Sequence, residues 1–355
     1  MQGRSECAVI GGGVAGLSSA LALLERGHGV TVLELGACGQ ESSWAGGGIL
    51  SPLCPWDYPD EVTRLTGRGA ELFPAWARTL HRATGIDPEY EPSGMLVLPP
   101  FDRAAAEAWC AAHAVRFQAG GEQEGILLPD VAQVRNPRLM HALQTRVAAL
   151  GGRILERCAV REIVVENGRV QKLMTACGEC EADLLIVAAG AWSKQVLGQL
   201  AQRLEIEPVR GQMLLYKFDA PPIPHIILQK DLYLIPRRDG HLLVGSTLEY
   251  AGFDKSTTPA AREDLSRRAA AILPQLAGMQ PVRHWAGLRP GSPGNIPTIG
   301  RHPHIENLYL NSGHFRYGVT MAPASVEILI NEIEGKPQPF DAAPYRAGWG
   351  GYGTE

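Results

Sequence analysis

Several features of membrane, secreted and nucleic-acid-binding proteins are absent from this sequence of 355 residues. No window approaches the roughly 18 consecutive apolar residues that a membrane-spanning helix needs. Residues 1–6 are polar and lead directly into an apolar run, so no secretory signal is expected. The formal net charge of −4 gives no attraction for nucleic acid, so DNA and RNA are not expected as main partners.

Cysteine is scarce and irregularly placed. The seven cysteines lack the spacing of a disulfide framework, which favours a cytoplasmic location. Cys177 and Cys180 form one close pair, but no second pair or nearby histidine follows to complete a zinc site. The pair lies between two strand-like runs, so a hairpin turn that carries two thiols is favoured, and no metal is expected.

The N-terminal segment has the pattern of a strand, a glycine-rich turn, a helix and a second strand. The apolar run Cys7–Ile10 is followed by Gly11-Gly-Gly-Val-Ala-Gly16, and residues 17–26 are rich in Leu and Ala. Two glycines then stop the predicted helix, and residues 30–34 form the next strand-like run. The opening therefore predicts a compact βαβ unit.

Within this unit, the spacing Gly11-x-Gly13-x-x-Gly16 is typical of a dinucleotide-binding turn. Gly11 permits a tight turn, Gly13 lets a pyrophosphate approach the backbone, and Gly16 lets helix and strand pack closely. The helix N-terminus attracts phosphates. Glu34, at the end of the second strand, can accept hydrogen bonds from ribose hydroxyls. A merely glycine-rich turn is the alternative, disfavoured because strand, helix and acid are all in place.

Glu34 does not decide between FAD and NAD, because both carry an adenosine ribose. Residues 41–48 are polar and glycine-rich, so their hydroxyls and bare N–H groups can hold the rest of an extended dinucleotide. Residues 184–192 read as a buried strand that ends in small residues, which leave room for a cofactor. For the second segment alone, tight packing of one more parallel strand is a reasonable alternative. Together the two segments favour FAD.

Regular elements are also predicted further along the chain. Asn-Gly and Asp-Gly are preferred pairs for hairpin turns, and Pro near a helix start and Gly after its end mark helix boundaries. These signals predict hairpins at 160–174 and 231–247, and helices at 136–150, 259–273 and about 323–334.

The alternation of βα segments at both ends with hairpins between them predicts an α/β fold of two interleaved domains. Hydrophobic residues, 45% of the chain, suffice for such a core. One domain is a discontinuous Rossmann-type FAD-binding domain, and the other is a mostly antiparallel-sheet substrate domain. The expected ranges are 1–80, 131–205 and 284–346 for the first, 81–130 and 206–283 for the second, and 347–355 for a loose tail.

Seven motifs occur in an order that resembles a known family. They are the opening turn, ESSWAGGGI at 41–49, IVAAGAWS at 186–193, GQM at 211–213, YLIPRRDGHLLVGST at 233–247, WAGLRP at 285–290 and GHFRYGVTMAP at 313–323. Together they resemble the D-amino-acid-oxidase-like flavoproteins, and most closely the glycine oxidases of thiamine biosynthesis. The likeness covers the chain from about Cys7 to Tyr345. The last two motifs are far more specific than the nucleotide turn.

The resemblance implies three catalytic residues, Arg289, Tyr233 and Arg316. Arginine suits bidentate recognition of an amino-acid carboxylate, and apolar neighbours make the Arg289 position unsuitable for an unpaired charge. By the residues alone, a salt-bridged structural role is the commoner one for an arginine such as Arg289, a core or interface aromatic is about an equal interpretation for Tyr233, and Arg316 could be a surface charge. The loop that holds Arg316 leads into a helix whose N-terminus would stabilise negative charge on a flavin.

The resemblance also implies the remaining site residues. Substrate would contact Arg289, Tyr233, Arg316, Leu248 and Ile49. Leu248 stands where some relatives have Met, and Asp231 stands where some have His. Cofactor would contact Gly11, Gly13, Val14, Ala15, Gly16, Glu34, Leu35, Ser42, Ser43, Trp44, Ala45, Gly47, Gly48, Ile49, Val160, Ala189, Gly190, Trp192, Arg289, His314, Phe315, Arg316, Tyr317, Gly318, Val319 and Thr320.

The implied activity is oxidation of glycine, sarcosine or a small D-amino acid to the imine, with hydride transfer to the flavin and reoxidation by O2 to H2O2. FAD would be non-covalent, because residues 289–299 contain no cysteine. Thiazole synthase downstream and a homo-oligomer, tetramer or dimer, are the expected partners. The open alternatives are a D-amino-acid dehydrogenase with a quinone acceptor, an NAD-dependent dehydrogenase, and a flavin-binding protein without amine oxidation.

Overall fold

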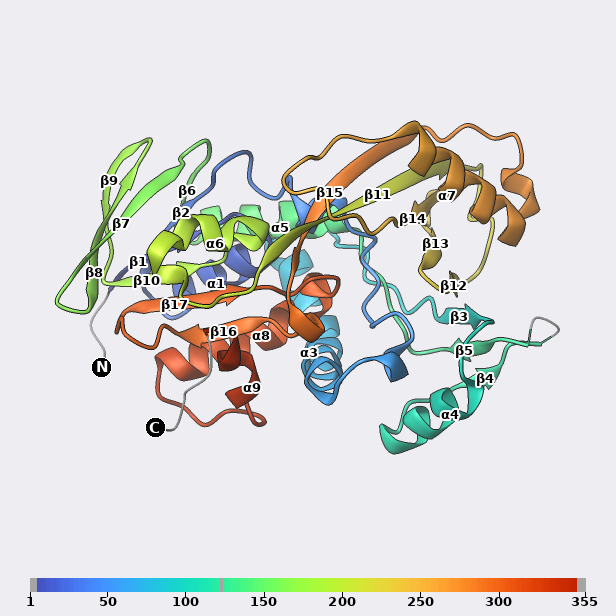
Figure 1. The fold of residues 1–355 in the computed structure, drawn as a ribbon, viewed down its shortest axis with the longest axis horizontal. Helices are drawn as coiled ribbons and strands as arrows, with labels where there is room; N and C mark the ends of the chain where they lie inside the picture. The colour runs from blue at the N-terminus through green and yellow to red at the C-terminus, as the bar shows by residue number, and fades with distance from the viewer. Residues whose placement is uncertain (1–4, 122–123, 350–355) are drawn as a thin grey trace.

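The computed structural model describes residues 5–121 and 124–349. Its first sheet has the order β16-β17-β10-β1-β2-β6 (Figure 1). The strands are parallel except β16, which is antiparallel to β17. Their bounds are β1 Glu6–Ile10, β2 Gly29–Leu33, β6 Arg153–Leu155, β10 Leu184–Val187, β16 Thr298–Arg301 and β17 Leu308–Ser312.

The two faces of this sheet are covered by different elements. Because side chains alternate along a strand, Val9 and Ile186 face one side while Ile10 and Val187 face the other. The first side packs against helices α1 (Val14–Leu24), α5 (Asn136–Ala149) and α8 (Gly318–Ile333). The second side packs against α6 (Ser193–Leu197) and a three-stranded sheet of β7 (Val160–Glu166), β8 (Arg169–Thr175) and β9 (Gly178–Glu181). Coverage of both faces explains the apolar runs in β1 and β10.

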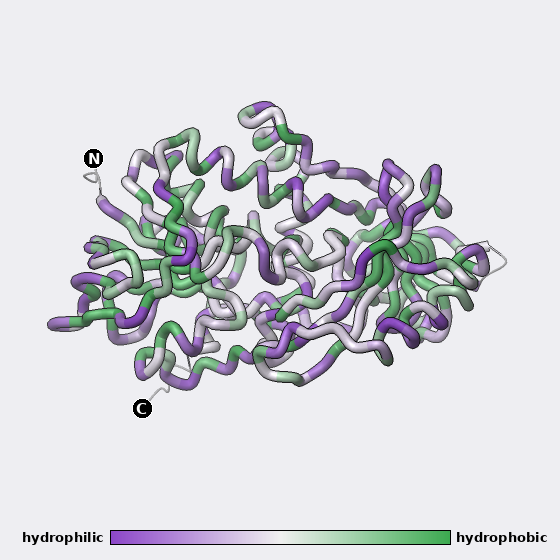
Figure 2. Tube along the Cα trace, turned by 90° about the horizontal axis from the view of Figure 1, so that it is seen from above, coloured by the Kyte–Doolittle hydropathy of each residue, from purple (hydrophilic) through white to green (hydrophobic). Residues whose placement is uncertain are grey.

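A second sheet has the order β15-β11-β14-β13-β12-β3-β5-β4 and is antiparallel except where β12 meets β3. Helix α7 (Pro259–Ile272) packs on one of its faces. Apolar segments gather in both halves of the molecule (Figure 2). The strands are β3 Met95–Leu98, β4 Gln118–Ala119, β5 Ile126–Leu128, β11 Glu207–Lys217, β12 Ile226–Gln229, β13 Leu232–Pro236, β14 His241–Gly245 and β15 Arg283–Gly291.

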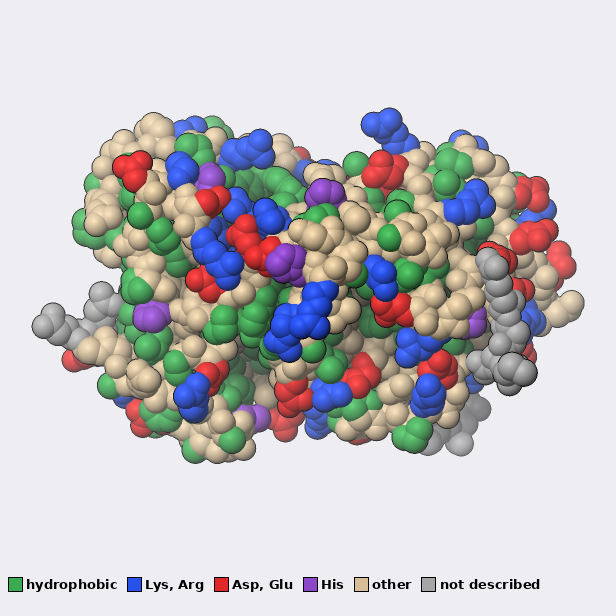
Figure 3. Space-filling model, turned by 180° about the vertical axis from the view of Figure 1, so that it is seen from behind, with side chains coloured by type: hydrophobic (Ala, Val, Ile, Leu, Met, Phe, Trp, Pro, Cys, Tyr) green, Lys and Arg blue, Asp and Glu red, His purple; other side chains and the backbone are tan. Residues whose placement is uncertain are grey.

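The remaining helices are distributed over both parts of the fold, and α4 lies beside β4 and β5 of the second sheet (Figure 1). α3 packs against α8, and α2 against α5. On the face seen in Figure 3, basic and acidic side chains are interspersed. Among the described residues, no helix combines the length and apolar character needed to cross a membrane. The bounds are α2 Ser42–Ala45, α3 Asp60–Thr84, α4 Arg103–Ala112 and α9 Ala343–Arg346.

The predicted α/β class and both predicted hairpins are confirmed. Asn167 and Gly168 both have positive φ, 50° and 72°, as a type I′ turn requires. Cys177 lies in the turn between β8 and β9, and Cys180 lies within β9.

The predicted start of the C-terminal helix at Pro323 is wrong, because α8 begins at Gly318. Pro323 is the sixth residue of α8, so only one intrahelical N–H bond is lost near the helix start. The helix predicted at 136–150 is α5, which spans Asn136–Ala149 with Arg135 as its N-cap.

The domain ranges remain predictions. β15 falls within the predicted range 284–346 yet pairs with β11 in the second sheet. In the predicted tail, Ala347–Trp349 form a 3-10 turn and the Trp349 ring is buried. Residues 350–355 lie outside the described residues.

Candidate active site

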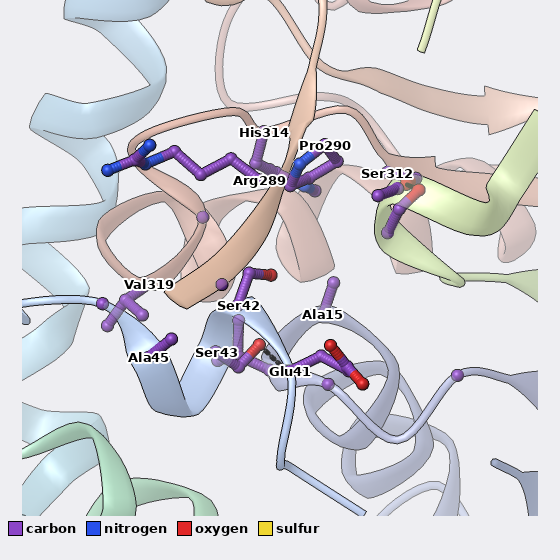
Figure 4. Close-up of a pocket in the computed structure, with 18 of the residues that line it drawn as sticks. Ala15, Glu41, Ser42, Ser43, Ala45, Arg289, Pro290, Ser312, His314 and Val319 are labelled. Carbon is purple, nitrogen blue, oxygen red and sulfur yellow. Dashed lines mark hydrogen bonds between the residues drawn. The ribbon is translucent and has the colours of Figure 1, made fainter. Parts of the chain in front are cut away.

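A cavity of about 530 Å³ opens at the carboxyl ends of the parallel strands. It is lined by the segments that follow β1, β10 and β17, which meet at one edge of the sheet, and by β13 and β15 of the second sheet. Every residue predicted to hold the cofactor lines it except Gly16 and Trp44, and every predicted substrate residue except Leu248. Figure 4 shows residues of β15 and of the segment after β17 facing those of α2 and α1.

The glycine turn is built by close backbone contacts. Gly11 has φ 110°, and a Cβ there would lie 2.3 Å from the Ala188 carbonyl oxygen. A Cβ on Gly16 would lie 1.9 Å from the Gly11 carbonyl oxygen, so Gly16 serves helix–strand packing without lining the cavity. Larger residues would fill the space between the turn and β10, so this cradle fits a dinucleotide.

Glu34 is fixed at the end of β2 by two backbone donors. Its carboxylate accepts hydrogen bonds from the N–H groups of Gly12, at 2.7 Å, and Gly36, at 2.8 Å. The side chain is buried and lines the cavity. A carboxylate has about four acceptor sites, so lone pairs remain for ribose hydroxyls.

The segment after β2 is held against the glycine turn. The Val14 N–H donates to Ser43 Oγ at 2.9 Å, and Asn136 Nδ2 donates to the Ser43 carbonyl at 2.8 Å. Trp44 points away from the lining and packs edge-on against Trp285, with ring centroids 5.8 Å apart. Its contribution is to join α2 to β15.

Arg289 reaches the cavity from β15 with neutral partners only. Its guanidinium donates to Ser246 Oγ at 2.5 Å and to the Thr247 carbonyl at 3.2 Å. No carboxylate of the described chain lies within ion-pair distance of it. A Cβ on Gly211 would lie 2.2 Å from Nη1, so the glycine of the GQM motif makes room for this side chain. Burial lowers the pKa of Arg289, and the nearby Tyr233 opposes that shift.

Two tyrosines stand at the same end of the cavity. Tyr233 is buried, and its hydroxyl lies 3.8 Å from Met213 Sδ. The Tyr317 hydroxyl accepts a hydrogen bond from the Leu53 N–H at 3.3 Å, and its ring packs edge-on against Tyr58. Burial raises the pKa of Tyr317 well above its usual value, so this phenol stays neutral.

The segment between β17 and α8 lies along the cavity with His314, Phe315 and Arg316. His314 is buried, its Nε2 lies 2.9 Å from Ser325 Oγ, and burial lowers its pKa to about 4. Arg316 lies over the Phe315 ring at 5.8 Å from the centroid and has no carboxylate partner among the described residues. The first residues of α8 also line the cavity, which brings the positive end of the helix dipole to it.

Leu248 lies outside the cavity wall. β14 ends at Gly245, so Leu248 leaves the sheet and its side chain is 40% exposed. Asp231 also lies outside the wall and pairs with Arg268 of α7, so its charge is compensated away from the cavity.

Sequence reasoning missed several lining residues, among them Glu41, Asn136, Ser246 and Lys255. Lys255 Nζ lies 2.7 Å from the Glu41 carboxylate. Nothing local in the sequence marks Lys255, because the ion pair joins residues more than two hundred positions apart. Ser246 could have been found, since it lies inside the YLIPRRDGHLLVGST motif.

The glycine cradle, the bound Glu34 and the cavity define a dinucleotide-dependent oxidoreductase, and the comparisons specify its family. The chain matches the model of the FAD dependent oxidoreductase (DAO) family over residues 6–331 and belongs to this family. It is an FAD-dependent amino-acid oxidase, as the motifs predicted.

Three relatives illustrate the likeness. A glycine oxidase of Pseudomonas aeruginosa is 44% identical, covering 95% of this chain and 97% of that protein. The bifunctional protein ThiO/ThiG of a Synechocystis species is 31% identical over 94% of this chain, which spans 52% of that longer protein. The crystal structure of glycine oxidase from Geobacillus kaustophilus has a TM-score of 0.90 at 26% identity, covering 96% of this chain and 98% of that one.

Proposed function

We propose that the protein oxidises glycine, sarcosine or a small D-amino acid to the corresponding imine. The observation that carries this proposal is the unpaired Arg289. A partly buried guanidinium with only neutral partners is costly unless a ligand supplies the missing anion. The α-carboxylate of an amino acid supplies it, and the Tyr233 hydroxyl lies close enough to donate a further hydrogen bond to the same carboxylate.

The protein's contribution to the chemistry is positioning. Bound FAD would supply a two-electron hydride acceptor at N5, with O2 as the final oxidant and H2O2 as its product. Arg289 and Tyr233 fix the carboxylate, so that the Cα–H bond can point into the cofactor part of the cavity. The substrate reacts as the neutral amine and needs no base at Cα. The neutral His314 imidazole, which contacts Ser325, is therefore not required as a base at Cα. The protonated Tyr317 phenol is not required as a base either.

The product would serve thiazole formation for thiamine. Support comes from the Synechocystis relative, which is named as a bifunctional protein ThiO/ThiG. We propose thiazole synthase as the downstream partner, in the cytoplasm, with the chain acting as a homo-oligomer. Because imines hydrolyse in water, the imine would reach thiazole synthase most efficiently if the two proteins acted close to each other.

Anaerobic flavin reduction tests the proposal. The purified holoenzyme is mixed with glycine, sarcosine, D-alanine and D-proline while flavin absorbance is followed. Bleaching by at least one of them, with peroxide formed on admission of air, is the expected result. Bleaching without peroxide would indicate a dehydrogenase that uses a quinone. No bleaching by any of the four would overturn the proposal and favour a flavin-binding protein without amine oxidation.

A further inference from the structure

We propose that Arg237 is a positioning residue for the cofactor, which fixes the Gly47–Ile49 segment of the cavity wall and places a positive charge behind it. Arg237 follows the last residue of β13, on the side of the Gly47–Ile49 segment away from the cavity, and does not itself line the cavity. The inference rests on the FAD site alone and not on the identity of the substrate.

Arg237 is a buried cation whose partners are all neutral oxygens. Its Nη2 donates to the Gly47 carbonyl at 2.7 Å, and its Nη1 donates to the Val134 carbonyl at 2.9 Å and to Gln133 Oε1 at 2.7 Å. The side chain is 4% exposed, and within the described residues no carboxylate lies at ion-pair distance. Desolvation lowers the pKa of Arg237 to about 10, so the guanidinium remains charged at neutral pH.

The carbonyls next to Gly47 are held as well. The Gly48 carbonyl accepts from the Val134 N–H at 2.9 Å, and the Ile49 carbonyl accepts from Thr320 Oγ1 at 3.1 Å. The Gly48 and Ile49 N–H groups have no acceptor within the described chain, and both residues line the cavity. Because their carbonyls are already hydrogen-bonded to Val134 and Thr320, these two residues keep a fixed backbone orientation and can present their N–H groups as donors for the cofactor.

One face of β13 organises this arrangement. Tyr233, Ile235 and Arg237 are two residues apart, so their side chains point to the same side of the strand. A Cβ on Gly47 would lie 2.5 Å from Ile235 Cδ1 and 3.3 Å from Tyr233 Cε2, so all three side chains face the Gly47 backbone. The strand that carries the proposed carboxylate contact therefore also fixes the backbone that meets the flavin.

The charge of Arg237 has an electronic consequence for bound FAD. A carbonyl that accepts from a cation polarises its peptide bond, so the Gly48 N–H becomes a stronger donor. Flavin gains negative charge on reduction, and a fixed positive charge with strengthened donors stabilises that state in a low-dielectric site. The structure thus predicts that Arg237 raises the midpoint potential of the bound flavin.

Sulfite binding and the midpoint potential test this without any amino-acid substrate. Sulfite adds to oxidised flavin and leaves a negative charge on the ring, so its affinity reports the local field. In Arg237→Gln, the midpoint potential should fall and sulfite should bind roughly ten- to hundredfold more weakly, the range for loss of a hydrogen bond to a charged group. Arg237→Lys keeps the charge and should recover most of both properties.

Arg238→Gln is the matched control. Arg238 is the adjacent residue, half exposed and paired with Glu91 and Asp87 at the surface, so its loss removes the same charge outside the cavity. Both properties should stay at wild-type values in this variant. The proposal is overturned if folded, FAD-loaded Arg237→Gln keeps the wild-type potential and sulfite affinity.

If the Arg237→Gln protein does not fold, the Arg237→Lys protein remains as the test. The shorter ammonium cannot reach the Gly47, Val134 and Gln133 oxygens together, so FAD should dissociate faster than from wild type. An FAD dissociation rate equal to wild type in Arg237→Lys would also contradict the inference. Failure of glycine to bleach the flavin would overturn the proposed function but leave these measurements valid.

Discussion

The Arg289 guanidinium donates a 2.5 Å hydrogen bond to Ser246 Oγ, and no carboxylate of the described chain completes its pairing. Neutral oxygens hold the guanidinium in place but leave its charge uncompensated. The positions of β11 and β14 create this state, because β11 supplies the glycine on which Arg289 packs and the residue after β14 supplies the hydroxyl. The binding of an anionic group is therefore prepared by the fold before any substrate arrives.

Substitution of Arg289 should separate substrate binding from cofactor binding. Arg289→Ala is expected to raise KM for the amino acid by at least about a hundredfold, because truncation of a buried charge pair typically costs several kcal/mol. FAD content should be unchanged. Arg283→Ala, at the exposed start of the same strand, is the control and should leave KM unaltered. Steady-state kinetics with flavin absorbance would decide, and an unchanged KM in Arg289→Ala would remove the carboxylate assignment.

The part of the site that residue spacing alone predicted is built by neighbours in the chain, whereas the distant lining residues, such as Tyr233 and Arg289, were predicted only through the resemblance. The turn between Gly11 and Gly16 connects β1 directly to α1, so its glycine spacing carries the geometry. Glu34 follows β2 in the same unit. Strand, turn and helix are short-range features, and their signals lie within about thirty residues.

The missed features depend on contacts between distant segments. Ser246 and Gly211 meet Arg289 only because β11 pairs with both β14 and β15. Leu248 was expected in the pocket by resemblance, but β14 ends three residues earlier, so alternation along the strand no longer determines where it points. The start of α8 was misplaced because Pro323 was taken as a boundary, although it lies inside the helix, one turn after its start, where it removes a single N–H bond.

The Glu41–Lys255 ion pair should slow FAD release modestly. The pair joins Glu41, the residue before α2, to the loop after β14. In the same loop, the Phe253 ring lies 5.4 Å from the Trp192 ring, measured between centroids. Both side chains of the ion pair are partly exposed, so an effect of at most about fivefold on the dissociation rate is expected in Lys255→Ala. The effect should vanish in high salt. Lys336→Ala, which removes an exposed lysine far along the chain, serves as the control; a salt-independent change would contradict the ion-pair explanation.

Two glycines of α3 should respond oppositely to alanine. Gly67 is exposed with open space at its Cβ position, so Gly67→Ala should stabilise the protein by about 1 kcal/mol through helix propensity. A Cβ on buried Gly69 would lie 2.0 Å from the carbonyl oxygen of Thr320, a cavity residue of α8. Gly69→Ala should therefore destabilise by roughly 1–3 kcal/mol and weaken FAD retention. Thermal unfolding with and without FAD measures both, and equal shifts in the two variants would contradict the α3–α8 contact.

His314 should make stability depend on pH between its folded and unfolded pKa values. Burial lowers its pKa to about 4, and among residues 5–121 and 124–349 its one hydrogen-bond partner is the Ser325 hydroxyl. An unfolded histidine titrates near 6.5, so between these values the unfolded state binds more protons and stability falls as pH decreases. From pH 7 to pH 5 this one group accounts for a loss of roughly 2 kcal/mol.

His314→Gln should remove that share of the pH dependence while leaving the share from carboxyl groups. The measurement is urea unfolding at pH 7 and pH 5, at a fixed FAD concentration, for wild type and variant. His113→Gln is the control, because His113 lies on the surface and its substitution should leave the wild-type difference intact. A His314→Gln protein that loses as much stability as wild type between the two pH values would show that this imidazole is already protonated, or exposed, in the native state.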